Sequence, residues 1–237
     1  MRRKTKARFL TAPLLDAIPG LVHGFGMKGG GARTVPGGRK DCGLRLVFLD
    51  QVHSDIIRFY SRPPRVPKPG DAAATDRPGL LPAVKTADCL PVLLADQERR
   101  VAAAVHCGWR GTAARLAEKT VRALEKRYGC RPARLRAALG PCIGPRCYEV
   151  GEDVRLAFRK AGLPLRVFKP LRGRPGKFAL DLAGANRAQL LRAGLRARNI
   201  DRLPLCTHCR PDLCSYRRDP KRSGRQINFI GFVRIAF

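Results

Sequence analysis

The sequence predicts an α+β fold with a single domain, because strand-like and helix-like patterns alternate along the whole chain. The short apolar run 101–105 is typical of a buried strand, whereas the spaced apolar residues of 112–128 predict an amphipathic helix. No linker-like composition divides the 237 residues, a length that suffices for one large core. We therefore expect residues 1–237 to form one domain, with residues 1–20 as a leading segment.

Short strands are expected in the first half of the chain, separated by loops. A turn at Pro19-Gly20 ends the leading segment. Residues 27–40 are rich in glycine and residues 61–70 contain four prolines, so both are expected to be loops. The expected strands are residues 21–26, 44–52, 83–86, 91–95 and 101–105.

Two of these strands form a predicted β-hairpin. Residues 91–95 and 101–105 are apolar and flank the polar turn 97–100, which is a hairpin pattern. Pairing of the two strands would bring Cys89 and His106 to the same end of adjacent strands.

The second half of the chain predicts helices between further short strands. Residues 112–128 form the clearest helix, with Thr112 as its N-terminal cap and Gly129 after its end. Two more helices are expected at 152–161 and 182–195. The remaining strands are expected at residues 135–139, 178–182 and 226–232.

The chain is strongly basic, with 48 Lys and Arg residues against 18 acidic ones and a net charge of +30. Such a charge favours adhesion to polyanions at low salt. Arginine is nevertheless spread through every segment, without a basic arm or a patch interleaved with aromatic residues. We therefore do not expect specific nucleic-acid binding.

The sequence predicts a cytoplasmic protein that does not enter the membrane. It contains no run of 18 apolar residues, and the apolar part of the N-terminal segment is too short and interrupted by prolines for a signal peptide. The nine cysteines are scattered and odd in number. This distribution favours free thiols in a reducing compartment over a disulfide framework.

Three residues near predicted strand ends are candidate metal ligands. They are His53, Cys89 and His106, separated by 36 and 17 residues, so the fold rather than a local finger would assemble the site. Cysteine with histidine suits zinc or copper, and three protein ligands with an open position are typical of catalytic zinc. The alternatives are that His53 caps a strand end and that Cys89 is a small buried apolar residue.

Ordered motifs along residues 21–235 identify a related family. They are Gln51-Val52-His53, Thr86-Ala87-Asp88-Cys89-Leu90-Pro91, Val105-His106-Cys107-Gly108-Trp109-Arg110-Gly111, Gly140-Pro141-Cys142-Ile143-Gly144 with Tyr148-Glu149-Val150, and Ser215-Tyr216-Arg217-Arg218-Asp219 with Ser223-Gly224-Arg225-Gln226. In this order they closely resemble the motifs of the bacterial laccase-domain family. Its members have been labelled multicopper polyphenol oxidases, purine nucleoside phosphorylases and peptidoglycan editing factors.

The resemblance implies a fold, a metal and an activity. The fold is a four-layer α-β-β-α sandwich with mixed sheets. The metal is zinc, with copper less expected, on the residues matching His53, Cys89 and His106. The implied partners are purine nucleosides and phosphate, in the phosphorolysis of adenosine, inosine, guanosine and methylthioadenosine and the deamination of adenosine.

Two further residues have expected roles in such reactions. Arg110 precedes the helix expected from Thr112, and together they could bind phosphate. Asp88 could shuttle a proton during deamination, beside the catalytic candidates Cys89, His53 and His106. The alternatives are an ion pair between Arg110 and a local carboxylate, and a turn hydrogen bond from Asp88.

The chain departs from the family pattern in four places. Residues 31–44 are shorter than the matching segment, and Gly26-Met27-Lys28 has lysine where arginine is common, which puts anion recognition there in doubt. Cys107 replaces a small apolar residue and is expected in the core. The group Cys206-Thr207-His208-Cys209 with Cys214 has metal-binding composition but lacks the second pair of a zinc ribbon, so free or redox-active thiols are favoured.

Three other functions compete with the nucleoside activity. A copper-dependent polyphenol oxidase is disfavoured because a multicopper cluster needs many histidines and the chain has four. A peptidoglycan-precursor hydrolase with Cys89 as nucleophile would use the same residues. If the protein were a non-catalytic nucleic-acid binder, its binding would fall steeply with salt and would survive mutation of His53 and Cys89. For the oligomeric state we expect a monomer or a small homo-oligomer.

Overall fold

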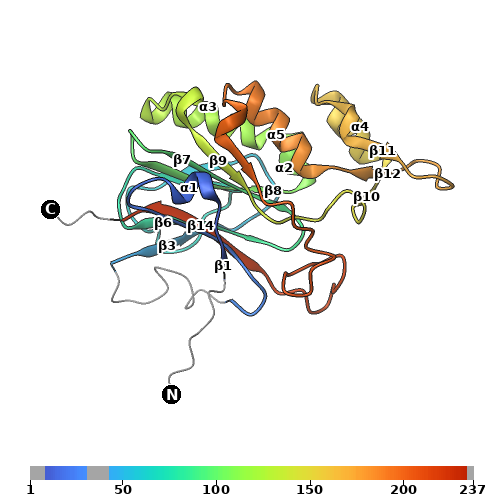
Figure 1. The fold of residues 1–237 in the computed structure, drawn as a ribbon, viewed down its shortest axis with the longest axis horizontal. Coiled ribbons are helices and arrows are strands. Elements are labelled where there is room, and N and C mark those ends of the chain that lie inside the picture. The colour runs from blue at the N-terminus through green and yellow to red at the C-terminus, as the bar shows by residue number, and fades with distance from the viewer. Residues whose placement is uncertain (1–8, 31–42, 234–237) are drawn as a thin grey trace, which may run out of the picture.

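The computed structural model describes residues 9–30 and 43–233, which form two stacked sheets with helices over one of them (Figure 1). The first sheet has five strands in mixed orientation, of which β3 and β6 are parallel and the other pairs antiparallel. In spatial order its strands are β1 (Phe9–Leu10), β2 (Leu21–Gly26), β14 (Gln226–Phe232), β6 (Leu80–Thr86) and β3 (Arg45–Phe48).

The second sheet has six strands and carries the predicted hairpin at its centre. The two outer pairs are parallel and the inner pairs antiparallel, so this sheet is mixed as well. In spatial order its strands are β13 (Ile200–Arg202), β9 (Arg136–Leu139), β7 (Leu90–Asp96), β8 (Val101–Cys107), β5 (Ala72–Thr75) and β4 (Ile57–Phe59).

Helices cover the outer face of the six-stranded sheet (Figure 1). They are α2 (Trp109–Ala113), α3 (Leu116–Tyr128) and α5 (Leu182–Arg192). Beside them, α4 (Glu152–Lys160) packs on a small sheet of β10 (Glu149–Gly151), β12 (Lys177–Leu180) and β11 (Phe168–Pro170). The short α1 (Pro13–Asp16) contacts β2 and β9. The described residues also contain the 3₁₀ turns η3 (Pro132–Arg134), η4 (Leu165–Val167) and η5 (Ala197–Asn199).

Alternation along the central strands fills two core layers. On β7, Leu93 packs toward the five-stranded sheet with Phe25, whereas Leu94 packs toward the helices with Val121. This period of two is expected for a strand buried on both faces. Gly140 packs against the Phe25 ring from the other layer, since a Cβ there would lie 2.2 Å from that ring, so a larger residue would force the two apart.

The α+β class, the mixed sheets and the hairpin are confirmed. Pro91 lies opposite His106 in the β7–β8 register, as the hairpin required. The helix predicted at 112–128 is corrected to two helices, because Arg115 has a left-handed backbone (φ 61°) that interrupts it. Thr112 lies inside the first helix, whose N-cap is Gly108, so its predicted role as a cap is wrong. Short strands β4, β5, β10, β11 and β13 were not predicted, because three or four residues give too little periodic pattern.

The resemblance implies four layers, and the described residues show three of them: the helices, the six-stranded sheet and the five-stranded sheet. Within the described ranges, α2, α3 and α5 lie over the six-stranded sheet, and no helix covers the outer face of the five-stranded sheet (Figure 1). Most of the glycine-rich segment and the short 31–44 region fall outside the described residues. None of the helices in the described ranges combines the length and apolarity that crossing a membrane requires.

Candidate functional site

The three candidate ligands, distant in sequence, meet at one end of the central strands. His53 lies on the loop after β3, Cys89 directly precedes β7 and His106 is close to the end of β8. One ligand atom from each lies within 4.8 Å of the others. The two imidazole rings meet edge to face, with centroids 4.9 Å apart and planes at 76°. The fold therefore assembles the predicted His-Cys-His group.

Asp71, which the sequence analysis did not identify, holds one of these histidines. It is fully buried at the start of β5, and its Oδ1 accepts a hydrogen bond from His106 Nδ1 at 2.8 Å. Its Oδ2 accepts hydrogen bonds from the backbone N–H and hydroxyl of Ser54, next to His53. One carboxylate thus fixes both histidine-bearing segments. The only sequence signal was an acidic residue opening an alanine-rich strand after a proline-rich loop.

The electrostatics of the group favour a thiolate. Burial alone would raise the pKa of Cys89, but hydrogen bonds and charge from His106 and His53 outweigh it and lower the pKa to about 6. Burial alone would lower the pKa of His106, yet its bonds to Asp71 and Cys89 raise it to about 9. A thiolate is the form of cysteine that acts as a nucleophile or a metal ligand.

Local backbone strain is concentrated at this site. His53 and Asp88 both have positive φ angles, 58° and 86°, which side chains other than glycine rarely adopt. Gly108 is required for a different reason: a Cβ there would lie 3.1 Å from Cys89 Sγ and 3.2 Å from His53 Cδ2. The chain therefore keeps the space around the cysteine and histidine free.

The residues present fit a soft or borderline metal ion. One sulfur and two imidazoles form a donor set suited to zinc, and three protein ligands leave a position for a small molecule. The Asp71 carboxylate accepts from Nδ1 of His106 and leaves Nε2 as the ligand atom. A carboxylate is a usual hydrogen-bond partner for the second ring nitrogen of a metal-binding histidine.

Asp88 is buried and bonded on both oxygens to protein groups. Its Oδ1 accepts the Thr207 hydroxyl at 2.6 Å, and its Oδ2 accepts the backbone N–H of Arg217 at 2.7 Å. These two bonds join the segment before β7 to the long loop between β13 and β14. The geometry favours the structural alternative for Asp88 over the proton shuttle.

A cavity of about 560 Å³ opens over the three candidate ligands. This volume lies within the range of roughly 300–1,000 Å³ that small-molecule sites occupy. Gln51 forms one wall and bonds through both amide atoms to the backbone of Lys85, so the two segments are joined. The lining residues are Leu49, Asp50, Gln51, His53, Lys85, Ala87, Cys89, His106, Tyr216 and Arg225.

The cations of this cavity are Lys85 and Arg225, to which the sequence analysis gave no role. Arg110 is exposed on α2, where its guanidinium stacks on Trp109 at 4.5 Å, and it is not among the lining residues. Lys28 pairs with Asp219 at 3.8 Å. Arg110 as the phosphate ligand stays a prediction, whereas the structure presents two other cations to the cavity.

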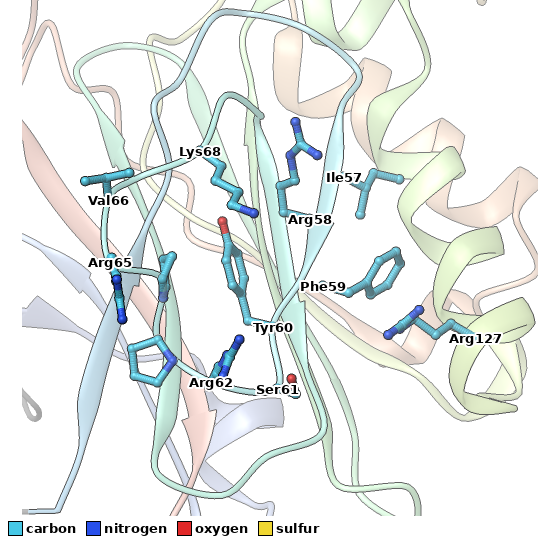
Figure 2. Close-up of a pocket in the computed structure, with 12 residues that line it drawn as sticks. Ile57, Arg58, Phe59, Tyr60, Ser61, Arg62, Arg65, Val66, Lys68 and Arg127 are labelled. Atoms are coloured by element: carbon cyan, nitrogen blue, oxygen red, sulfur yellow. The ribbon is translucent and has the colours of Figure 1, made fainter.

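A second cavity, of about 770 Å³, lies along β4 and the proline-rich loop and contains none of the candidate ligands (Figure 2). Arg127 reaches it from α3 and stacks on Phe59 at 4.7 Å. Its lining includes Arg58, Arg62, Arg65, Lys68 and Arg127, and no carboxylate. The fold therefore adds Arg127 to four cations of one short segment, on a surface suited to the expected polyanion adhesion.

Comparison with known proteins decides the family. The sequence model described as "Multi-copper polyphenol oxidoreductase laccase" matches residues 39–233. The chain belongs to this family. Solved structures of similar proteins share the fold: YlmD from Geobacillus stearothermophilus has a TM-score of 0.82 and 29% identity, covering 96% of this chain and 100% of that one. The YfiH protein of Bacillus licheniformis has a TM-score of 0.80 and 32% identity, covering 90% and 92%.

Curated relatives of this laccase family carry enzyme names. A "Purine nucleoside phosphorylase" from Deinococcus radiodurans is 46% identical over 167 residues, 70% of this chain. "Adenosine deaminase RL5", from an unknown prokaryotic organism, is 39% identical over 165 residues, 69% of this chain. The match spans 62% of the length of each of these two relatives. Similarity to these named enzymes shows that the chain is related to enzymes.

Proposed function

We propose that this protein is a metal-assisted purine nucleoside phosphorylase that also deaminates adenosine. The observation that carries the proposal is the cavity in which His53, Cys89 and His106 lie near the cations Lys85 and Arg225. The names of the relatives supply the substrate class, purine nucleosides. Adenosine, inosine, guanosine and methylthioadenosine are the proposed substrates.

In phosphorolysis, a nucleoside and phosphate give a free purine base and ribose-1-phosphate. The phosphate dianion needs positive charge, and Lys85 and Arg225 are the cations that line the cavity. Tyr216 lines the same cavity with an exposed ring, on which a purine could stack. Asp71 holds the proton on Nδ1 of His106, so the ring keeps one orientation during the reaction.

Zinc is the proposed ion, held by His53, Cys89 and His106, and when bound it would supply Lewis-acid chemistry. Deamination converts adenosine and water to inosine and ammonia. The buried Asp71 and the closely packed Gly108 keep the ligands in fixed positions for either reaction. Gln51 keeps the cavity wall at Lys85 in place through its paired amide bonds.

A cysteine hydrolase acting on a peptidoglycan precursor is the second candidate. A specific observation favours it: Cys89 bonds to His106 and His106 bonds to Asp71, which is the arrangement of a nucleophile, a base and an orienting carboxylate. The pKa of Cys89 is also lowered to about 6. Multicopper oxidation has less support, because His23 bonds to Ala12 and His208 lies in a separate group. The cavity over Cys89 is lined by two histidines.

A product assay with defined metal content tests the proposal. The protein is incubated with adenosine, with and without phosphate, and the products are separated chromatographically. We expect adenine and ribose-1-phosphate only with phosphate, inosine without it, and loss of both activities in H53A and C89A. The control C130A removes a buried thiol elsewhere and should remain active.

Absence of products from a folded, metal-loaded protein would reject the nucleoside activity. The same preparation would then be assayed for release of an amino acid from a peptidoglycan precursor. In that hydrolase, C89A would abolish turnover, and removal of metal by a chelator would leave the thiolate able to react.

A further inference from the structure

A second group of soft ligands lies apart from the cavity over Cys89. Cys147 lies on the loop between β9 and β10, and His208 and Cys209 lie on the loop between β13 and β14. Their ligand atoms are within 4.8 Å of one another, and Cys147 Sγ and Cys209 Sγ are 3.4 Å apart. The two cysteines are 62 residues apart in the sequence, so the fold and not a local finger brings them together.

Cys206 adds a fourth donor atom to this group. Its Sγ accepts a hydrogen bond from the backbone N–H of Gly144 at 3.1 Å. The backbone N–H groups of His208 and Cys209 also face this sulfur, and its side chain bonds to that of Cys209. The hydrogen bond from Gly144 holds this sulfur beside the loop that carries Cys147.

We propose that Cys147, Cys206, His208 and Cys209 bind a structural zinc ion. Three thiolates and one imidazole are a donor set found in closed, four-coordinate zinc sites. Zinc–sulfur and zinc–nitrogen bonds of about 2.3 and 2.0 Å place the ligand atoms of a tetrahedron roughly 3.5–3.8 Å apart. The sulfurs of Cys147 and Cys209 already lie near this separation.

The charge around the group suits such an ion. Zinc with three thiolates and a neutral imidazole carries one net negative charge. Arg146 and Arg202 line the same small cavity as Cys147, Cys206 and Cys209, which places positive charge beside the group, and Arg202 also pairs with Asp181 at 3.4 Å. Cys147, His208 and Cys209 form a close group of three, like the three ligands at Cys89, and Cys206 would have to join them to leave no open position.

The ion would hold in place a loop that reaches the catalytic cavity. Thr207, between two of the proposed ligands, donates its hydroxyl to Asp88 and its backbone N–H to the carbonyl of Cys142. Asp88 immediately precedes Cys89. A metal linking Cys147 to this loop would therefore fix the Thr207–Asp88 contact without touching substrate.

Metal stoichiometry tests the proposal without reference to nucleoside activity. The reduced protein is loaded with Zn²⁺, freed of excess ion by gel filtration and measured by elemental analysis. We expect about two equivalents in the native chain, and about one in either H53A/C89A or C147A/C209A. Cys214→Ala is the matched control, since Cys214 lies on the same loop outside the group, and it should keep both ions. Wild-type stoichiometry in C147A/C209A would overturn the proposal.

Cobalt spectroscopy keeps the test independent of that double variant. In H53A/C89A the first group has lost its sulfur, so any thiolate-to-cobalt charge-transfer absorption on adding Co²⁺ reports the second group. We expect this absorption to persist in H53A/C89A and to weaken when His208→Ala is added. Its absence in folded H53A/C89A, or a Cys147–Cys209 disulfide in the reduced, zinc-loaded protein, would reject the site.

Discussion

The carboxylate of Asp71 accepts a hydrogen bond from Nδ1 of His106 at 2.8 Å, in a position where both side chains are buried. The other oxygen of the same carboxylate accepts two hydrogen bonds from Ser54, the residue after His53. The two histidines of the candidate metal site are therefore held through one acidic residue. The geometry of the ligands depends on a side chain that is not itself a ligand.

Asp71→Asn should weaken metal binding while the protein stays folded. Asparagine can accept from His106 with its oxygen, but its amide then presents N–H groups to the Ser54 donors. Loss of such an outer partner commonly lowers metal affinity about 10- to 100-fold. Competition with a chelator measures the affinity, and D50N, which alters an exposed carboxylate of the same cavity, is the control. Equal affinities in D71N and the native protein would contradict this role.

Gly108→Ala should disturb the site through one added methyl group. The φ and ψ of Gly108, −70° and 172°, are accessible to alanine, so the backbone is not the obstacle. The new Cβ would lie 3.1 Å from Cys89 Sγ, closer than van der Waals contact allows. We expect reduced metal content and reduced activity. The free energy of unfolding should fall by no more than about 3 kcal/mol. Unchanged metal content would show that Cys89 and His53 can move aside.

The sequence could predict the centre of this fold because its signals are local. Apolar runs on either side of a polar turn specify the β7–β8 hairpin, and the hairpin alone places Cys89 beside His106. Asp71 could not be found in this way. The strand that follows it, β5, has only four residues, and its partner His106 is 35 residues away along the chain. Only the pairing of β5 with β8 brings the two together.

Two other features depend on contacts that the hydrophobic periodicity of the sequence does not reveal. The break between α2 and α3 at Arg115 follows from a left-handed residue in a sequence that is otherwise helical. That residue forms close hydrogen bonds with Glu118, on the first turn of α3. Cys147 was not recognised as a partner of Cys206 and Cys209, because the Cys-x-x-Cys pattern shows one half of the group and the other half lies on a distant loop.

Arg225→Ala should raise the KM for phosphate, while Arg110→Ala should change it little. Arg225 lines the cavity, and hydrogen bonds to Ser223 and the Gly224 carbonyl hold its guanidinium. Loss of a charged hydrogen bond corresponds to roughly tenfold or more in binding. Steady-state kinetics with varied phosphate measures both variants. The reverse order of effects would support the phosphate site predicted from the sequence at Arg110.

Acid should destabilise the fold through His23. The Nε2 atom of this buried histidine accepts the backbone N–H of Ala12 at 2.9 Å, which requires the neutral ring. Burial lowers the pKa of His23, and the charge of Asp16 opposes this only in part. The unfolded state, with a pKa near 6.5, then binds more protons, so the free energy of unfolding falls as the pH drops from 6.5 through the folded pKa.

Denaturant unfolding at a series of pH values from about 7.5 to 5 measures this effect, with H23Q as the comparison. Glutamine retains a hydrogen-bond acceptor but does not titrate. The stability difference between the native protein and H23Q should therefore change in the acid range and level off as the pH approaches about 7.5. A constant difference across the whole range would show that His23 is not the group responsible. Other titrating groups cancel because both proteins contain them.

Thr207→Val and Asp88→Asn should impair the enzyme to a similar degree if Asp88 positions the cysteine segment. Valine removes the donor at 2.6 Å from Asp88 Oδ1. Asparagine cannot accept from both the Thr207 hydroxyl and the Arg217 N–H. Each change leaves a buried polar group without its partner, at a cost of about 1–3 kcal/mol in the free energy of unfolding.

The pH dependence of kcat separates this role from the predicted proton shuttle. A positioning carboxylate acts through geometry, so T207V and D88N should both lower kcat without altering the shape of its pH profile. A shuttle acts through its own ionisation. In that case D88N would remove one limb of the profile and lower kcat far more than T207V, which keeps the carboxylate. Comparing the two variants therefore decides between the alternatives that the sequence left open for Asp88.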